Sequence, residues 1–150
     1  MATFTKIPDF IEAAMEGVHN FASHTLRIAL SNTAPGSEAS PPTTSGNGVL
    51  ANVTQIAYTN YTDSLTTDRT LASVTSDESG GTYTLDAANF TITASGGAIP
   101  NFRYIYLYND TPTSPADPLV GVWDHGSTIS LADGNTANIN INASGILTVT

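Results

Sequence analysis

The segment Asp124–Ser127 reads Asp-His-Gly-Ser and so contains the three residue types of a Ser-His-Asp hydrolase within four positions. Catalysis by a triad requires the three side chains to converge in space, next to a donor set that stabilises an oxyanion. Neighbouring residues in one turn point in different directions, and the chain contains no G-x-S-x-G motif. We therefore interpret the segment as a turn between strands at 119–124 and 127–131.

The other residues that could do chemistry are few and dispersed. His19 and His24 are five positions apart, a spacing that does not place both on one helix face, and the chain has no cysteine to complete a zinc site. Most of the acidic residues lie in turn-like contexts, and 133–135 is only a fragment of a calcium-loop pattern. We predict no catalytic, cofactor-binding or metal site, which favours a binding or structural protein.

The composition excludes several classes of function. Charged residues make up 11% of the 150 residues, and four Lys and Arg stand against 13 acids, for a net charge of -9. So few basic residues cannot neutralise many phosphates, and an anionic membrane surface would repel the chain. We therefore expect neither nucleic acid nor a membrane as partner, and no apolar run approaches the roughly 18 residues of a spanning helix.

One helix is predicted, at residues 8–17, where Pro8 suits the first turn and Gly17 the C-terminal cap. Its apolar residues share one face, which either packs on the rest of the chain or docks on a partner. A strand with period-two alternation follows at 25–31. Residues 33–48 are then rich in Pro, Gly, Ser and Thr, which predicts a long loop of the kind that is usually functional or mobile.

Short apolar segments separated by turn residues predict a series of strands in the rest of the chain. Residues 102–108 are apolar on both faces, so we expect a central strand that is covered on both sides. This pattern predicts an all-β, jelly-roll-like β-sandwich of one domain at 1–150, with an N-terminal arm and short helix at 1–24 and a β-domain at 25–150. The further strands are predicted at 50–58, 70–76, 82–85, 87–94, 102–108, 119–124, 127–131, 136–142 and 146–150.

Three groups of segments resemble a family of small tailed-phage virion proteins. They are 18–21 with 25–35, then 90–97 with 102–110, and then 117–124 with 130–134 and 145–149. The resemblance spans nearly the whole chain and implies a jelly-roll-like capsid cement or decoration protein. Such a protein would sit on the outer surface of the capsid of a virion, clamp adjacent major capsid subunits and form a homo-oligomer. The family implies no catalytic residues, and the chain departs from it in a longer loop at 35–48.

The net charge agrees with the outside of a shell that is filled with DNA. The hypothesis predicts that the loop at 33–48 or a set of apolar residues in the N-terminal arm contacts the capsid or a sister subunit. The alternatives are a tail, baseplate or fibre-associated virion protein, and a carbohydrate-binding jelly roll in which Tyr58, Tyr61, Tyr104 or Trp123 stacks on sugar. The candidate interface residues of the arm are Phe4, Ile7, Phe10, Ile11 and Met15.

Overall fold

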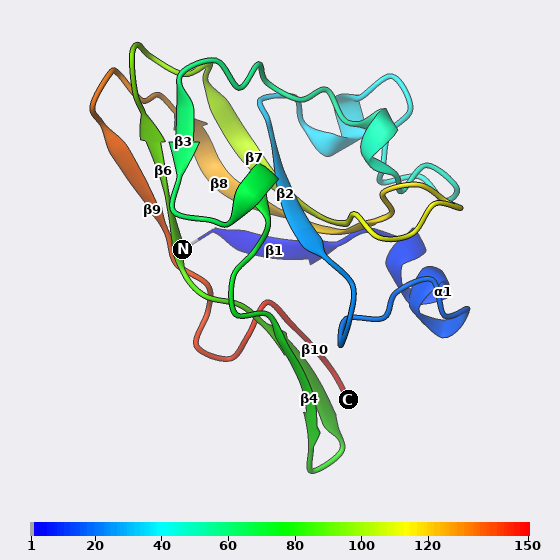
Figure 1. The fold of residues 1–150 in the computed structure, drawn as a ribbon. Helices are drawn as coiled ribbons and strands as arrows, with labels where there is room; N and C mark the ends of the chain where they lie inside the picture. Colours follow the sequence, from blue (N-terminus) through cyan, green and yellow to red (C-terminus); the bar gives the residue numbers. More distant parts are fainter. Residues whose placement is uncertain (1) are drawn as a thin grey trace.

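A computed structural model describes residues 2–150 and contains three antiparallel sheets and one short α-helix in that range (Figure 1). The helix, α1, spans Asp9–Met15. The strands are β1 (Thr3–Lys6), β2 (Leu26–Ser31), β3 (Tyr61–Asp63), β4 (Thr75–Ser79), β5 (Thr82–Asp86), β6 (Phe90–Ala94), β7 (Phe102–Asn109), β8 (Leu119–Ile129), β9 (Thr136–Ile139) and β10 (Leu147–Val149).

The largest sheet has the strand order β1-β8-β7-β2. Strand β1 was not predicted, because its four residues lie in the N-terminal arm, where the sequence shows no clear alternation. It pairs antiparallel with β8, and the centres of the Phe4 and Trp123 rings lie 4.7 Å apart. Gly121 makes this contact possible, since a Cβ at that position would overlap the Phe4 ring.

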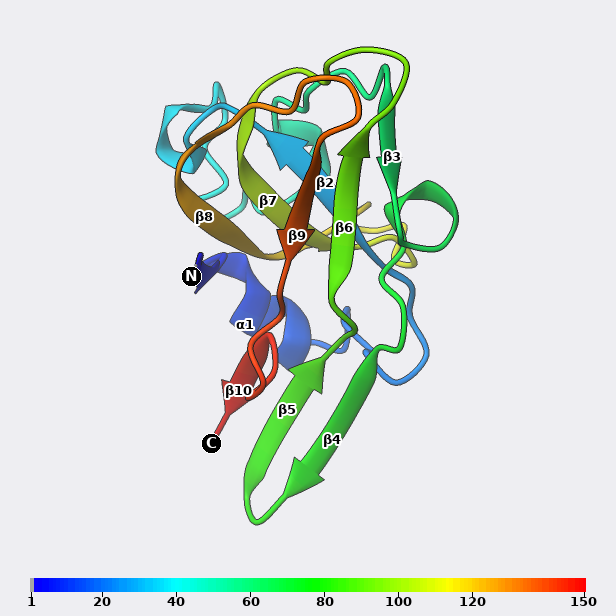
Figure 2. The ribbon, with the colours of Figure 1, turned by 90° about the vertical axis from the view of Figure 1, so that its left-hand side faces the viewer.

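The second layer consists of two three-stranded sheets, β3-β6-β9 and β10-β5-β4, that follow one another end to end (Figure 2). The chain runs from β5 into β6 through residues 87–89, where strand pairing is interrupted. There the Asn89 side chain accepts a hydrogen bond from the amide of Ile141 at 2.7 Å. The β4–β5 hairpin projects beyond the rest of the molecule as a result (Figures 1 and 2).

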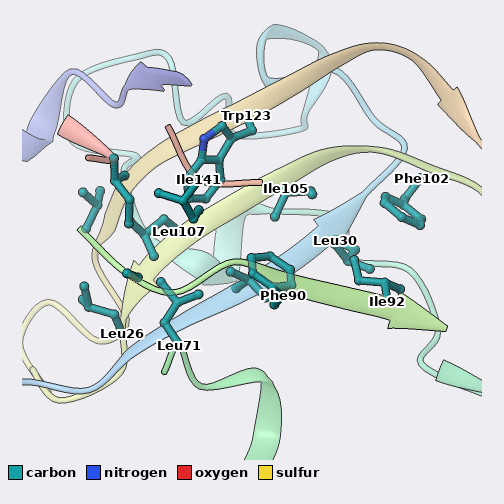
Figure 3. Packing of buried hydrophobic residues seen from close by; sticks show 14 of the residues in the cluster. Leu26, Leu30, Leu71, Phe90, Ile92, Phe102, Ile105, Leu107, Trp123 and Ile141 are labelled. Atoms are coloured by element: carbon teal, nitrogen blue, oxygen red, sulfur yellow. The ribbon is translucent and has the colours of Figure 1, made fainter. Parts of the chain in front are cut away.

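The main core lies between the two layers. Figure 3 shows Phe90 and Ile92 of β6 lying against Leu30 of β2, and all three side chains are at most 2% exposed. These residues follow the period-two alternation that buries one face of a strand. The prediction of an all-β, sandwich-like fold with one short N-terminal helix is confirmed.

The opposite face of β7 carries a second core, which we call the tyrosine face and define by Tyr104, Tyr106 and Tyr108. The residues around 33–53 and the segment after β1 cover it, with Val53 and Ile7 in contact. The predicted central strand with two covered faces is therefore confirmed. Strict period-two alternation would place Phe102 on the tyrosine face, but Phe102 packs in the main core, because the register of β7 shifts between Phe102 and Tyr104.

The turn predicted at Asp124–Ser127 is wrong, because β8 continues through it to Ile129. Tyr104 of β7 pairs with Asp124, whereas Phe102, two residues earlier, pairs with Ile129, so the extra residues of β8 form a bulge. Gly126 adopts φ +87° within this bulge, a conformation that glycine allows without steric cost.

The strand predicted at 50–58 is also wrong. Leu50–Asn52 form a single 3-10 turn, and the following backbone makes isolated hydrogen bonds in place of a strand ladder. The Thr54 amide donates to the Glu38 carboxylate at 3.0 Å, and the Ile56 amide donates to the Leu30 carbonyl of β2 at 2.9 Å. Strand β3 was missed because only three residues pair, and β4 begins five residues later than the predicted 70–76.

Candidate docking surface

Helix α1 is fixed to the rest of the chain at its first turn. Phe10 is 2% exposed and enters the main core. The Asp9 carboxylate accepts hydrogen bonds from the amides of Gly46 at 2.9 Å and Gly48 at 2.8 Å. The helix ends two residues before Gly17, which has φ +77°, so it is shorter than the predicted 8–17.

A groove of about 680 Å³ lies between α1, the segment 19–22 and the β10-β5-β4 sheet, and we call it the helix–hairpin groove. Figure 2 shows α1 behind this sheet, with β10 on the same side. The chain thus brings residues from its beginning, middle and end to one surface. The lining residues are Phe10, Ile11, Ala14, Met15, His19, Asn20, Phe21, Ala22, Ser76, Glu78, Tyr83 and Val149.

The large apolar side chains that remain exposed in residues 2–150 gather at this groove. Ile11 is 47% exposed, Met15 84% and Val149 42%, and all three line it. Single exposed apolar residues are common on protein surfaces, but a contiguous apolar patch with a polar rim is typical of an interaction site. The groove is therefore the strongest candidate for a docking surface.

The five candidate interface residues of the arm are divided between the interior and the surface. Ile7 and Phe10 are each 2% exposed, so they pack inside the chain and present almost no surface to a partner. Phe4 is half-buried against Trp123. Only Ile11 and Met15 are exposed, and both line the helix–hairpin groove.

Tyr83 and Val149 of the groove were missed by the sequence reasoning. They lie in strands far along the chain, and no local signal connects them with α1. Tyr83 and Val149 are paired in register between β5 and β10, so the sheet places them side by side beneath the helix.

Two histidines meet behind the groove although their spacing excludes one helix face. The Asn109 side-chain amide donates to Nδ1 of His19 at 3.1 Å and to Nδ1 of His24 at 2.9 Å. Both imidazoles accept through Nδ1, so the hydrogen of neutral His19 lies on Nε2. Burial, and secondarily the neighbouring His24, lower the pKa of His19 to about 4, and the residue is neutral near pH 7.

The Asp124–Ser127 bulge does not align the groups of a triad. Ser127 Oγ lies 3.3 Å from His125 Nδ1, but the Asp124 carboxylate receives Arg103 Nε at 2.7 Å and Nη2 at 2.8 Å. These hydrogen bonds lower the pKa of Asp124. Asp124 is thus engaged by Arg103 and does not orient the imidazole of His125.

The aromatic residues proposed for sugar stacking are covered by the chain to different degrees. The Arg69 guanidinium lies 3.9 Å from the centre of the Tyr58 ring, and Tyr61 meets Tyr58 edge to face at 5.3 Å. Tyr104 is 7% exposed and Trp123 8%. Tyr104 and Trp123 are thus almost closed to solvent, and Arg69 takes one face of Tyr58, whereas Tyr61 is only partly buried.

Within residues 2–150, no three His, Cys, Asp or Glu side chains come together as ligands for a metal ion. In the same range, no helix has the length and apolar character needed to cross a bilayer.

Comparison with known proteins identified no relative of this chain. No family model matches the chain, and no match was found among the curated proteins or the solved structures.

Proposed function

We propose that this chain is a structural virion protein of a tailed phage, a cement or decoration protein that binds the outer surface of the capsid. It would stabilise contacts between adjacent major capsid subunits and act in many copies. The observation that carries the docking role is the helix–hairpin groove, where Ile11, Met15 and Val149 leave apolar surface uncovered. The sequence resemblance to small tailed-phage virion proteins supports the choice of partner.

The charge and the polar composition support the outer location. A net charge of -9 is repelled by tightly packed DNA, so binding outside the shell is favoured over binding inside. Thr, Ser and Asn make up a third of the chain, and these neutral groups cost less to desolvate at an interface than charged groups. Many weak contacts on a repetitive shell add up through multivalency.

The test is to add the purified chain to capsids that lack a decoration protein. We expect saturable binding and a higher melting temperature of the capsids. Ile11→Ser combined with Met15→Ser should weaken binding at least tenfold, because the exposed apolar anchors are lost. Ala132→Ser, an exposed apolar-to-polar change outside the groove, is the matched control and should bind as the unchanged protein does.

Absence of binding to capsids would refute the proposal. Electron microscopy of labelled particles distinguishes the alternative location, since density on the tail, baseplate or fibres would assign the protein there and exclude a head cement.

A further inference from the structure

The rim of the helix–hairpin groove is acidic. Glu78 of β4 lines it directly. Glu78 is the one Asp, Glu, Lys or Arg among the lining residues. Glu12 of α1 and Glu16, the residue that follows the helix, are exposed but do not line the groove.

No basic side chain of the protein compensates this charge. Arg27 pairs with Asp110 at 3.1 Å, and Arg103 pairs with Asp124. Arg69 lies on Tyr58, and Lys6 belongs to β1 at another part of the surface. None of these four, which are all the Lys and Arg of the chain, lines the groove.

We propose that the helix–hairpin groove binds an amphipathic segment whose apolar side chains are flanked by Lys or Arg. The apolar residues would cover Ile11, Met15 and Val149, and the basic residues would meet the Glu78 carboxylate. The inference rests on the proposed function for the identity of the partner, which would be a segment of the capsid, but its chemistry follows from the groove alone. Opposite charges at a rim guide association and fix orientation.

A second copy of this chain is the less suitable occupant. Two grooves facing each other across a two-fold axis would place the Glu78 carboxylates of both copies in one interface that no Lys or Arg lines. Facing carboxylates without an intervening cation oppose association, and each chain carries a net charge of -9. The geometry therefore favours a partner of opposite charge.

The experiment is a library of amphipathic peptides with fixed Leu and Met anchors and with flanking positions varied among Lys, Arg, Gln and Glu. The library is selected for binding to the full chain. We expect at least fivefold enrichment of Lys and Arg over Glu at the flanking positions, and the best peptide should shift the NMR signals of Ile11, Met15 and Val149. Failure to enrich basic residues, or binding elsewhere on the surface, would overturn the proposal.

Adjacent acids on β4 provide a matched pair of variants. Ser76 and Glu78 line the groove, whereas Asp77 between them points to the other face of the hairpin. Glu78→Gln should weaken the best peptide roughly two- to fivefold, the range expected for one exposed charge pair. Asp77→Asn has the same effect on net charge and should leave the affinity unchanged. If both variants lose the same affinity for the peptide, the effect comes from the net charge of the chain and not from the groove, and the proposal is contradicted.

The same variants separate this inference from the proposed function. If capsids bind the unchanged chain and Glu78→Gln equally well, the inference fails while the capsid role stands. If basic peptides bind the groove but capsids do not bind the chain, the capsid role fails and the chemistry of the groove stands.

Discussion

The tyrosine face of β7 and the helix–hairpin groove are both apolar, but only the tyrosine face is covered by the chain itself. Tyr106 is fully buried beneath residues 33–53, whereas Met15 in the groove is 84% exposed. The covering segment contains few apolar residues, so its own hydrophobic burial is limited. Backbone hydrogen bonds hold it in place, from the Leu50 amide to the Asp117 carbonyl at 3.0 Å and from the Leu119 amide to the Gly48 carbonyl at 2.8 Å. Side-chain hydrogen bonds add to them.

Two carboxylates supply these hydrogen bonds. Asp9 accepts from the amides of Gly46 and Gly48, and the buried Glu38 accepts from both the amide and the hydroxyl of Thr54. A loop predicted to be functional or mobile thus becomes a fixed cover. The comparison teaches that hydrogen bonds, from the backbone at 117–119 and from two carboxylates, hold a polar segment over the tyrosine face, whereas Ile11, Met15 and Val149 in the groove stay exposed.

Of the variants considered, the one that removes a carboxylate anchor of the covering segment should lose the most stability. Glu38→Ala deletes two charge-assisted hydrogen bonds, and we expect the free energy of unfolding to fall by about 2–3 kcal/mol. Chemical denaturation measures the loss, and hydrogen exchange should accelerate in residues 33–53. Ser37→Ala, at an exposed neighbouring position, is the control. A loss below about 0.5 kcal/mol would show that the loop is held by other contacts.

Acidification should lower the free energy of unfolding through His19, which lines the groove. The unfolded chain takes up a proton at His19 near pH 6.5, whereas folded His19 stays neutral down to its pKa of about 4. Stability therefore falls as the pH drops through this window, and we expect a loss of about 2 kcal/mol at pH 5 relative to pH 8 from this residue. Melting curves of the unchanged chain and of His19→Gln measure the difference. The prediction fails if both proteins show the same pH dependence.

The tyrosine face contains one group that should cost stability. The Tyr106 hydroxyl is buried and has no hydrogen-bond partner among residues 2–150, and burial raises its pKa. Tyr106→Phe should raise the free energy of unfolding by up to about 1 kcal/mol. Tyr58→Phe is the opposite control, because its hydroxyl accepts from the Leu30 amide and donates to Gln55, so it should destabilise. Destabilisation by Tyr106→Phe would reveal a missing partner.

The smallest effect on folding is expected in the groove. Met15→Ser removes an exposed side chain, and we expect the free energy of unfolding to change by no more than about 0.5 kcal/mol. Urea denaturation checks this. A much larger loss would mean that Met15 packs inside the fold in solution, and the contrast between a covered face and an open groove would then disappear.

Local patterns in the sequence predicted much of the sandwich. The alternation of Leu26, Ile28 and Leu30 identified β2, and the two apolar faces of 102–108 identified β7 as central and covered. The errors fell where backbone partners come from distant segments. The bulge at Asp124–Ser127 has the composition of a turn, and its continuation as a strand depends on pairing with β7.

The sequence by itself determined an all-β chain with one short helix, few basic residues and a strong acid excess, because these follow from composition and local periodicity. It also predicted Ile11 and Met15 as interface candidates, but it could not separate them from Ile7 and Phe10, which are equally apolar. Only the tertiary structure decided which of them became buried. It brought Val149 beside α1 because β10 pairs with β5, and it placed Glu38 against Thr54 because the segment between β2 and β3 folds back on itself; no local pattern in the sequence specifies either contact.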